Sequence, residues 1–256
     1  MGFAPLLTET ERAGIPMVLD EASAERGLLV AFTRRAGGVS PAPYESLNLG
    51  TRVGDDPVAV AENRRRAARA MGFDPAHLAS SHQVHGRAVV SAGQDARGDL
   101  GEADIITVRD TDALAMILTA DCVPVVIAGT DAVAAVHAGW RGIARGAVEE
   151  GLARVGRPLV AWIGPSIRAC CYEVGPEVVA AFAAKDLPSA RAGRVDPADA
   201  ALRLLERSGV DRVAVADVCT SCDRRYFSHR RDGVTGRQGA FASWLHPPER
   251  FAEAAR

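Results

Sequence analysis

Two long apolar runs constrain the fold of this chain more than any other feature. They read ALAMILTADCVPVVIAG (residues 113–129) and AVAAVHAGWRG (residues 132–142) and are rich in Val, Ile and Ala. Runs of this composition are typical of strands that are buried on both faces, so we expect adjacent buried strands here. Each run carries one reactive side chain, Cys122 or His137, where the apolar residues give way to a turn. Strand ends commonly hold the reactive groups of sheet proteins, and their side chains can converge on one cleft.

The other expected elements interleave strands with helices. Strands are predicted over LLVAFTRR, PLVAWIGPSI and DRVAVADVC, and two short ones within LASSHQVHGRAVVSA. Helices are predicted over 57–71, 143–156, 176–186 and 196–209, because each has a proline near its start, a glycine at its end, or both. The tail from Asp223 is polar and arginine-rich and is predicted to be irregular. The pattern indicates the α/β (α+β) class, without the GxGxxG of a dinucleotide fold or a P-loop.

Length and composition favour a globular protein with a substantial core. The chain has 256 residues, 48% of them hydrophobic, with a mean hydropathy near zero and no internal repeat or linker. One domain over residues 1–256 is therefore expected. A formal net charge of −2 indicates neither a nucleic-acid nor a membrane-surface partner. No stretch approaches the roughly 20 apolar residues that span a bilayer, and the N-terminus does not resemble a signal peptide, so a cytoplasmic location is expected.

The five cysteines favour free thiols in a reducing compartment, since their number is odd and the chain is long enough to fold without disulfides. Cys219 and Cys222 form a CxxC pair, which could in principle make a four-sulfur metal site with Cys170 and Cys171. Adjacent cysteines chelate one tetrahedral ion awkwardly. Free thiols are therefore the preferred prediction at these four positions.

Histidine is scarce, and His85 lies in the polar centre of SHQVHG with His82 three residues before it. A single buried cysteine is usually an inert small hydrophobe, and a lone histidine in an apolar run is often a hydrogen-bonded core residue. The gaps between His85, Cys122 and His137 are much longer than those of a local CxxC or HExxH motif. From the residues alone, two interpretations stay open: a metal site, or three unrelated residues with structural roles.

Five motifs occur in a fixed order along the chain: SHQVHG, TADCVPV, VHAGWRG, GPSIRACCYEVG and CTSCDRRYFSHRRDGVTGR. Together they closely resemble the YfiH/YlmD family, long labelled laccase-domain or polyphenol-oxidase proteins. The earlier segment FTRRAGGVSPAPYESLNLG is similar to the N-terminal signature of that family, so the resemblance runs from about Phe32 to Leu245. It implies a single domain with mixed β-sheets packed face to face between helical layers, similar to a toxin deamidase.

The resemblance also implies a metal site with the ligands His85, Cys122 and His137. Zinc binds imidazole nitrogen and thiolate sulfur, and three protein ligands leave the fourth position open, as in catalytic sites. His82 is a candidate for a fourth ligand or for a supporting hydrogen bond. A site of this kind can also accept copper in vitro, because copper outcompetes zinc at most such sites.

The activity implied by the resemblance is purine nucleoside phosphorolysis together with adenosine deamination, which makes purine nucleosides and phosphate the expected partners. Arginines would hold the phosphate, and the candidate substrate-binding residues are Arg35, Asn48, Arg141 and Arg230, with Arg231 as a further arginine. Arg35 is aligned with the family arginine although the family often reads Ser-Thr-Arg where this chain has Thr33-Arg34-Arg35. Asp121 and Glu173 are the candidate catalytic carboxylates. A structural role for each arginine, and a loop-fixing role for Asn48, remain open.

Three other functions are compatible with the same residues. Copper-dependent phenol oxidation is disfavoured, since a laccase needs on the order of ten histidines and this chain has six. A cysteine hydrolase would use Cys122 as nucleophile and His137 as base, without a metal. A non-catalytic protein would hold a structural zinc that contributes directly to folding.

Overall fold

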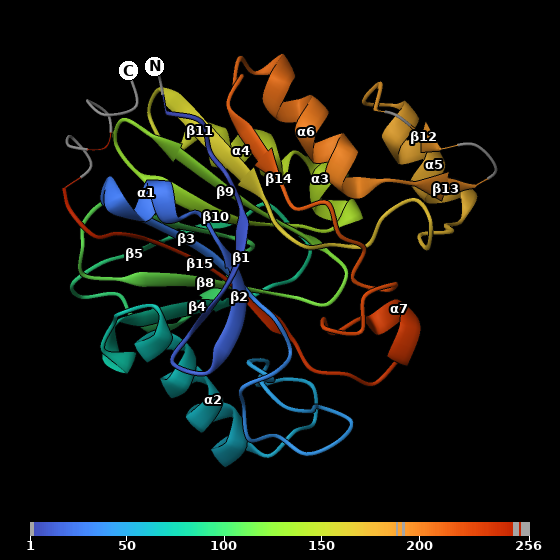
Figure 1. Ribbon diagram of the computed structural model, residues 1–256. Helices are drawn as coiled ribbons and strands as arrows, with labels where there is room; N and C mark the ends of the chain where they lie inside the picture. Colours follow the sequence, from blue (N-terminus) through green and yellow to red (C-terminus); the bar gives the residue numbers. More distant parts are fainter. Residues whose placement is uncertain (1–2, 188, 191–192, 248–250, 252–256) are drawn as a thin grey trace.

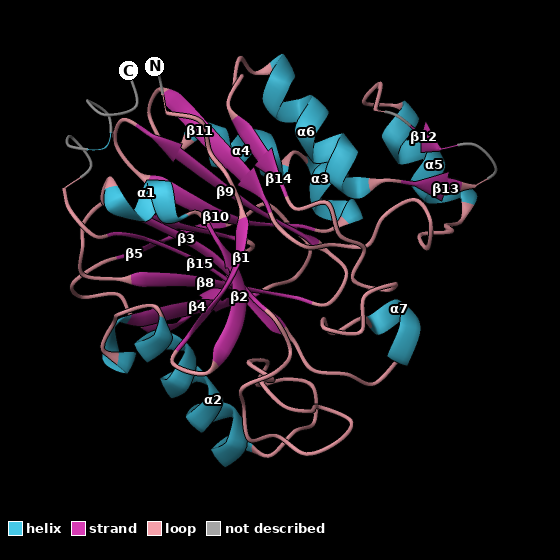
Figure 2. Cartoon of the chain, viewed as in Figure 1, coloured by secondary structure: helices cyan, strands magenta, loops and turns pink. Residues whose placement is uncertain are grey.

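The computed structural model describes residues 3–187, 189–190, 193–247 and 251. Two β-sheets face each other, and helices cover the outer face of each (Figures 1 and 2). This is the α/β arrangement, with sheets packed between helical layers, that the family resemblance implied.

The first sheet has seven strands in the order β1-β2-β3-β15-β8-β4-β6. Their bounds are Thr8–Arg12 (β1), Ile15–Leu19 (β2), Leu28–Thr33 (β3), Gln238–Trp244 (β15), Leu114–Thr119 (β8), Leu78–His82 (β4) and Gly98–Glu102 (β6). The sheet is mixed, because β4 runs parallel to both of its neighbours while the other pairs are antiparallel.

The second sheet has six strands in the order β14-β11-β9-β10-β7-β5. Their bounds are Val213–Val215 (β14), Pro158–Ile163 (β11), Val123–Gly129 (β9), Val133–Ala138 (β10), Ile105–Val108 (β7) and Val89–Ala92 (β5). The central strands β9 and β10 are antiparallel and pair His137 with Pro124. A two-stranded ribbon of β12 (Ser189–Ala190) and β13 (Arg194–Val195) lies apart from both sheets.

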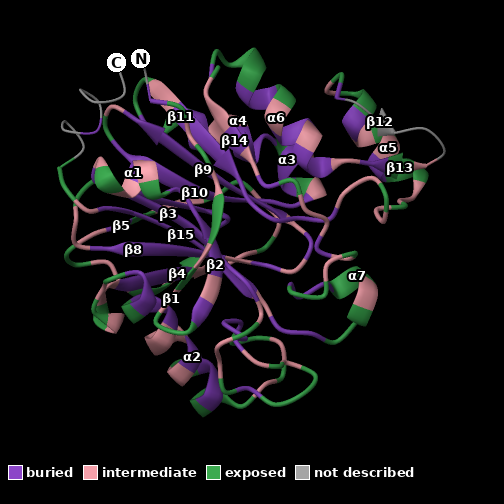
Figure 3. Cartoon of the chain, viewed as in Figure 1, coloured by how far each residue is buried: buried purple, intermediate pink, exposed green. Residues whose placement is uncertain are grey.

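Successive side chains of the central strands point alternately to the two faces of the sheet, and both faces are buried. In β9, Val126 and Ala128 face the other sheet, whereas Val125 and Ile127 face the helices. Trp162 and Trp244 lie in the layer between the sheets and are fully buried, and buried residues run through the central strands of both sheets (Figure 3). Since neither face of the central strands meets water, near-continuous hydrophobic runs are the sequence pattern they require.

The helices divide between the two outer faces. Helix α2 (Pro57–Ala70) packs on the seven-stranded sheet, and the helices α3, α4, α5 and α6 cover the six-stranded sheet (Figure 1). Bounds of the remaining helices are Glu21–Glu25 (α1), the 3-10 helix Pro75–His77 (η1), Trp140–Arg145 (α3), Ala147–Ala153 (α4), Pro176–Ala183 (α5), Pro197–Arg207 (α6) and His229–Asp232 (α7). In the described part of the chain, none of these helices has the length and hydropathy needed to cross a membrane.

Several sequence predictions were wrong in detail. The turn expected at Cys122 is present, but the strands on either side of it, β8 and β9, lie in different sheets, so only β9 is adjacent to β10. The helix predicted over 143–156 is broken at Gly146, whose φ of +89° ends α3 and precedes α4. The tail predicted to be irregular contains β15, which pairs with both β3 and β8 at the centre of the first sheet.

Candidate metal centre

Three side chains that are far apart in the sequence meet at one end of the layer between the sheets. The potential ligand atoms of His85, Cys122 and His137 all lie within 4.8 Å of one another. The two imidazole rings have centroids 4.8 Å apart and are close to edge-on. Two nitrogens and one thiol sulfur at this separation are a donor set that suits a tetrahedral metal ion with one position left open.

Both sheets contribute to this cluster. His137 lies near the end of β10, in phase with Val133 and Ala135, which face the other sheet, so its side chain points between the sheets. Cys122 comes directly before β9, at the turn where the chain passes from one sheet to the other. His85 lies in the loop after β4 with a φ of +59°, a left-handed conformation that few non-glycine residues adopt.

Asp104 joins two of these side chains and is completely buried. Its Oδ1 lies 2.7 Å from Nδ1 of His137 and also accepts the backbone N–H of His85 at 2.9 Å. Its Oδ2 accepts the backbone N–H of Gly86 at 2.6 Å. A carboxylate bonded to Nδ1 keeps the proton on that nitrogen and presents Nε2 as a metal ligand, as the second ring nitrogen of metal-bound histidines usually requires.

The electrostatics of the cluster favour a thiolate. Burial alone raises the pKa of Cys122, but the charge and hydrogen bonds of His137, and those of His85, lower it to about 6. For His137, burial opposes the charged form, but Cys122 and Asp104 together raise its pKa to about 9. The metal-free pair is therefore a thiolate beside an imidazolium, and a metal that binds here displaces the imidazolium proton.

Gly139 makes room for this cluster. A Cβ atom built on Gly139 would lie 2.6 Å from Nδ1 of His85 and 3.2 Å from Sγ of Cys122. The first of these separations is closer than real Cβ atoms come to other heavy atoms. A glycine is therefore required at the start of α3 for the imidazole to lie where it does.

The three side chains line a cavity of about 660 Å³, a size typical of small-molecule sites. Two half-buried arginines, Arg64 and Arg237, line the same cavity. Burial lowers the pKa of both guanidinium groups, which bond to carbonyl and hydroxyl oxygens. Among the described residues neither forms an ion pair, whereas the exposed Arg52 in the same cavity pairs with Asp99 at 3.5 Å. Two partly buried guanidinium groups that form no ion pair with the described residues favour the binding of an anion in this cavity.

Two further histidines line the cavity. His82 lies 3.5 Å from Glu102 and is not part of the group of ligand atoms that meet around Cys122. Nδ1 of His229 lies 2.6 Å from the carbonyl of Gly233, which requires a proton on Nδ1 and leaves Nε2 free. Gln83 bonds through both side-chain atoms to the backbone of Leu118, at 2.7 and 2.8 Å, and so has a structural role.

The two predicted catalytic carboxylates lie in different surroundings. Asp121 is buried with a φ of +92° and both of its oxygens are used, since Thr220 Oγ1 and the Arg230 backbone N–H each donate to it at 2.7 Å. It lies beside Cys122 but lines a different, smaller cavity, whose wall also includes Trp140. Glu173 is exposed and lines neither cavity. A catalytic role for either carboxylate stays a prediction.

The predicted substrate-binding residues lie outside the large cavity. Asn48 is fully buried, and its amide group bonds to Gly50, Asp55 and the backbone of Arg237, which organises its own loop. The guanidinium of Arg35 donates to the Glu45 carbonyl at 2.7 Å.

The remaining two predicted arginines are exposed and contact aromatic rings. Arg141 lies over the ring of Trp140 at 4.2 Å, and Arg230 lies over Tyr172 at 5.0 Å. Nη1 of Arg230 also donates to the Glu173 carbonyl at 2.7 Å.

Sequence reasoning did not single out Asp104, Arg64 or Arg237. Asp104 stands directly before the apolar strand β7. This position was the available signal, because a carboxylate buried there must have a hydrogen-bonding or charged partner. Arg64 is one of three consecutive arginines in α2 and could not be distinguished from its solvated neighbours by spacing. Arg237 lies in the segment predicted to be irregular.

The family model of the multi-copper polyphenol oxidoreductase laccases matches residues 29–245 of this chain. The chain belongs to this laccase-domain family. Purine nucleoside phosphorylase ORF3 of Streptomyces griseus is 43% identical over 232 residues, which cover 84% of this chain and 93% of the relative. Purine nucleoside phosphorylase YfiH of Escherichia coli is 37% identical over 235 residues, which cover 86% of this chain and 95% of the relative.

Solved structures of the laccase-domain family have the same fold. YlmD from Geobacillus stearothermophilus superposes with a TM-score of 0.84 at 29% identity and covers 94% of this chain and 99% of its own. Neisseria meningitidis protein NMB0706 superposes with a TM-score of 0.80 at 33% identity and covers 93% of this chain and 98% of its own. The predicted family membership and fold class are thereby confirmed.

Proposed function

We propose that this chain is a cytoplasmic, zinc-dependent purine nucleoside phosphorylase that also deaminates adenosine. One observation carries the proposal: a two-histidine, one-cysteine cluster and two desolvated arginines without counter-ions line the same cavity of about 660 Å³. Its volume suits a nucleoside together with phosphate. The names of the relatives support the same reaction.

In phosphorolysis, the arginines and histidines that line the cavity would bind phosphate and supply a proton. Arg64 and Arg237 hold phosphate, because a guanidinium matches two phosphate oxygens at once. One phosphate oxygen forms a bond to C1′ of the ribose while the bond from C1′ to the purine nitrogen breaks. The bonding electrons leave with the purine, which takes up a proton, so the products are free base and pentose 1-phosphate. His229 and His82 line the cavity and are placed to supply that proton.

Deamination of adenosine uses the same cavity with water in place of phosphate. Zinc, when bound, supplies a Lewis acid with an open coordination position. Water adds its oxygen to C6 of the purine, the amino group leaves as ammonia, and inosine remains. His229 can carry the proton from the water to the leaving amine, since its Nε2 is free and its ring is held by the Gly233 carbonyl.

The test is a nucleoside assay on the zinc-loaded chain. Adenosine with phosphate should yield adenine and ribose 1-phosphate, and adenosine without phosphate should yield inosine. Both activities should disappear in Cys122→Ser and after removal of the metal, and return on addition of zinc to the wild type. If the zinc-loaded chain leaves adenosine, inosine and methylthioadenosine unchanged with and without phosphate, the proposal is wrong.

The series Cys122, His137 and Asp104 favours a cysteine hydrolase as a second candidate. A thiolate beside an imidazole that a buried carboxylate orients is the arrangement of a nucleophile, its base and the group that positions the base. His85 has no assigned role in such a hydrolase, because the reaction needs only a nucleophile, a base and the residue that orients the base. Amidase activity that survives complete chelation and is abolished by alkylation of Cys122 would support this candidate over the phosphorylase.

A further inference from the structure

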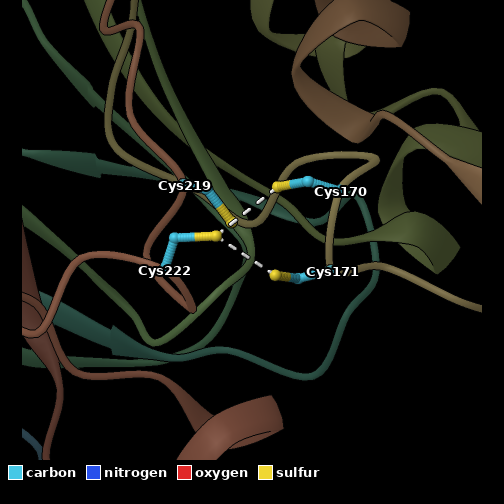
Figure 4. A group of neighbouring side chains, drawn as sticks. All are labelled: Cys170, Cys171, Cys219 and Cys222. Atoms are coloured by element: carbon cyan, nitrogen blue, oxygen red, sulfur yellow. Dashed lines mark hydrogen bonds between the residues drawn. The ribbon is translucent and has the colours of Figure 1, made fainter.

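A second group of side chains lies in two loops of the six-stranded sheet's edge and is not used by the proposed reaction. The sulfur atoms of Cys170, Cys171, Cys219 and Cys222 all lie within 4.8 Å of one another. Sγ of Cys222 is 3.7 Å from that of Cys170 and 3.3 Å from that of Cys171. Figure 4 shows all four sulfur atoms pointing into the space between the two loops.

We propose that these four cysteines bind a second zinc ion as a structural tetrathiolate site. A zinc–sulfur distance of about 2.3 Å in a tetrahedron places neighbouring sulfurs about 3.8 Å apart, close to the separations in this cluster. Four cysteines leave no open position, so the site would stabilise the fold and take no part in the reaction. The site is separate from the cluster at Cys122, and the proposal does not depend on the function proposed above.

Adjacent cysteines usually chelate one tetrahedral ion awkwardly, but the backbone conformation at Cys170 and Cys171 allows both to bind the same ion. Successive side chains point to opposite faces only in an extended strand. Residues 169–171 form a turn instead, in which the backbone N–H groups of Cys171 and Tyr172 both donate to the carbonyl of Arg168, at 2.9 and 3.0 Å. The turn places the sulfurs of Cys170 and Cys171 on the same side, as Figure 4 shows.

The CxxC segment has the matching geometry. The N–H groups of Cys222 and Asp223 donate to the Cys219 carbonyl at 3.1 and 2.9 Å, which folds the segment so that its two sulfurs face the same way. The backbone N–H of Arg168 donates to Sγ of Cys219 at 3.4 Å. Backbone N–H groups directed at sulfur stabilise the thiolate that a metal requires.

Two arginines supply positive charge at the same place. Nη1 of Arg194 donates to the Cys170 carbonyl at 3.2 Å, and Nη1 of Arg230 donates to the Cys171 carbonyl at 3.4 Å. A zinc ion with four thiolates carries two negative charges, so nearby guanidinium groups lower the cost of forming it.

The position of this cluster gives the metal a structural task. It links the loop before α5 to the loop that begins after β14, and Thr220, next to Cys219, donates to Asp121. Asp121 in turn precedes Cys122 in the chain. The tetrathiolate would therefore hold the loop that positions Thr220 against the turn carrying Cys122.

Metal stoichiometry on the full chain tests this proposal. Protein prepared without added metal and without oxidant should contain about two zinc ions per chain by mass spectrometry, one for each site. Cys122→Ser and the pair Cys219→Ser/Cys222→Ser should each retain about one zinc ion, and the matched control Ser221→Ala should retain about two. In Cys122→Ser, cobalt should produce the intense thiolate charge-transfer bands of a four-sulfur tetrahedral site.

A titration of Cys122→Ser, which keeps all four cysteines of this cluster, covers the case in which the cysteine pair variant does not fold. Titration with a mercurial reagent should release the second zinc ion as about four thiols react in Cys122→Ser. The proposal is overturned if Cys122→Ser contains no zinc, if cobalt gives no thiolate bands, or if peptide mapping of anaerobically prepared protein finds Cys222 in a disulfide with Cys170 or Cys171. Failure of the nucleoside assay would leave these outcomes unchanged.

Discussion

Oδ1 of Asp104 lies 2.7 Å from Nδ1 of His137, and both side chains are buried. The same oxygen accepts the backbone N–H of His85. A single buried carboxylate thus orients one imidazole through its ring and the other through its loop. The convergence of His137, in β10, with His85, in the loop between β4 and β5, depends on this buried carboxylate, which is not a member of the three-ligand cluster.

Asp104→Asn should weaken zinc binding at this cluster about ten- to a hundred-fold, the range measured for lost supporting carboxylates. An amide has only one acceptor oxygen. At the Oδ1 position it leaves the Gly86 N–H facing an NH₂ group, and at the Oδ2 position it turns the NH₂ group toward Nδ1 of His137 and the His85 N–H, so either arrangement disturbs the loop or the imidazole. Zinc affinity is measured by competition with a chromophoric chelator in protein that also carries Cys219→Ser/Cys222→Ser. The matched control is Asp110→Asn, an exposed carboxylate in a turn, where the affinity should not change. Equal affinities for Asp104→Asn and the unmodified cluster would contradict the assigned role.

Gly139→Ala should abolish metal binding at Cys122 while leaving the chain folded. The added Cβ would come within 2.6 Å of His85, and the imidazole must move out of the cluster because the backbone of Gly139 is held at the start of α3. The readouts are zinc content and the circular dichroism spectrum. Gly93→Ala is the control, since a Cβ there meets only the Asp110 carboxylate at 3.4 Å. A variant that keeps full metal content would show that the cluster has more room than this contact implies.

Arg64→Lys and Arg237→Lys should each raise the KM for phosphate by about ten- to a hundred-fold, since a charged hydrogen bond contributes about 1.5–3 kcal/mol. A lysine keeps the charge but cannot offer two parallel donors to a phosphate. The KM for the nucleoside should change much less, so the measurement is initial rate against each substrate separately. Arg52→Lys is the matched control, because Arg52 lines the same cavity but is already paired with Asp99. A similar rise for all three variants would argue against a defined anion site.

Asp20→Ala should lower the free energy of unfolding by about 2–4 kcal/mol. Asp20 is buried, caps α1 through the Ser23 N–H and accepts the indole N–H of Trp162 at 2.7 Å from the facing sheet. Its loss therefore removes a cap and leaves a buried donor without a partner. Asp74→Ala, which removes only an exposed cap of η1, should cost about 1 kcal/mol in the same denaturant titration. A smaller effect at Asp20 than at Asp74 would mean that the indole finds another acceptor.

Much of the secondary structure could be predicted because local patterns carry it. The helix at residues 57–70 begins at Asp56, whose side chain accepts from Val58, and continues with proline, which is the start that its sequence indicates. The turn between β8 and β9 is visible in the sequence, but their placement in different sheets is not, because both strands are apolar on both faces. Strand β15 was missed since its neighbours β3 and β8 are about 200 and 120 residues away in the chain, and no local pattern encodes such pairing.

The metal cluster of the candidate site could be predicted in part from the sequence, whereas the cavity beside it could not. Cys122 and His137 stand where apolar runs end, so their positions were visible in the sequence. The cavity was not, because Arg64 and Arg237 differ from the other arginines in being partly buried at this cavity, which depends on the three-dimensional fold. Likewise, the four remaining cysteines converge through two turns whose relative position depends on the whole sheet.

Of the three side chains at Cys122, His137 comes from a strand of one sheet, whereas His85 and Cys122 lie in two connections that cross to it from the other sheet. An ion held by all three would bind the facing layers together at one edge, and none of these layers could separate without breaking a bond to it. Metal uptake at this cluster should therefore accompany the last docking step of folding, because an unfolded or half-assembled chain has no complete donor set. Starvation for the ion would then lower the amount of intact protein in the cell as well as the rate of its reaction.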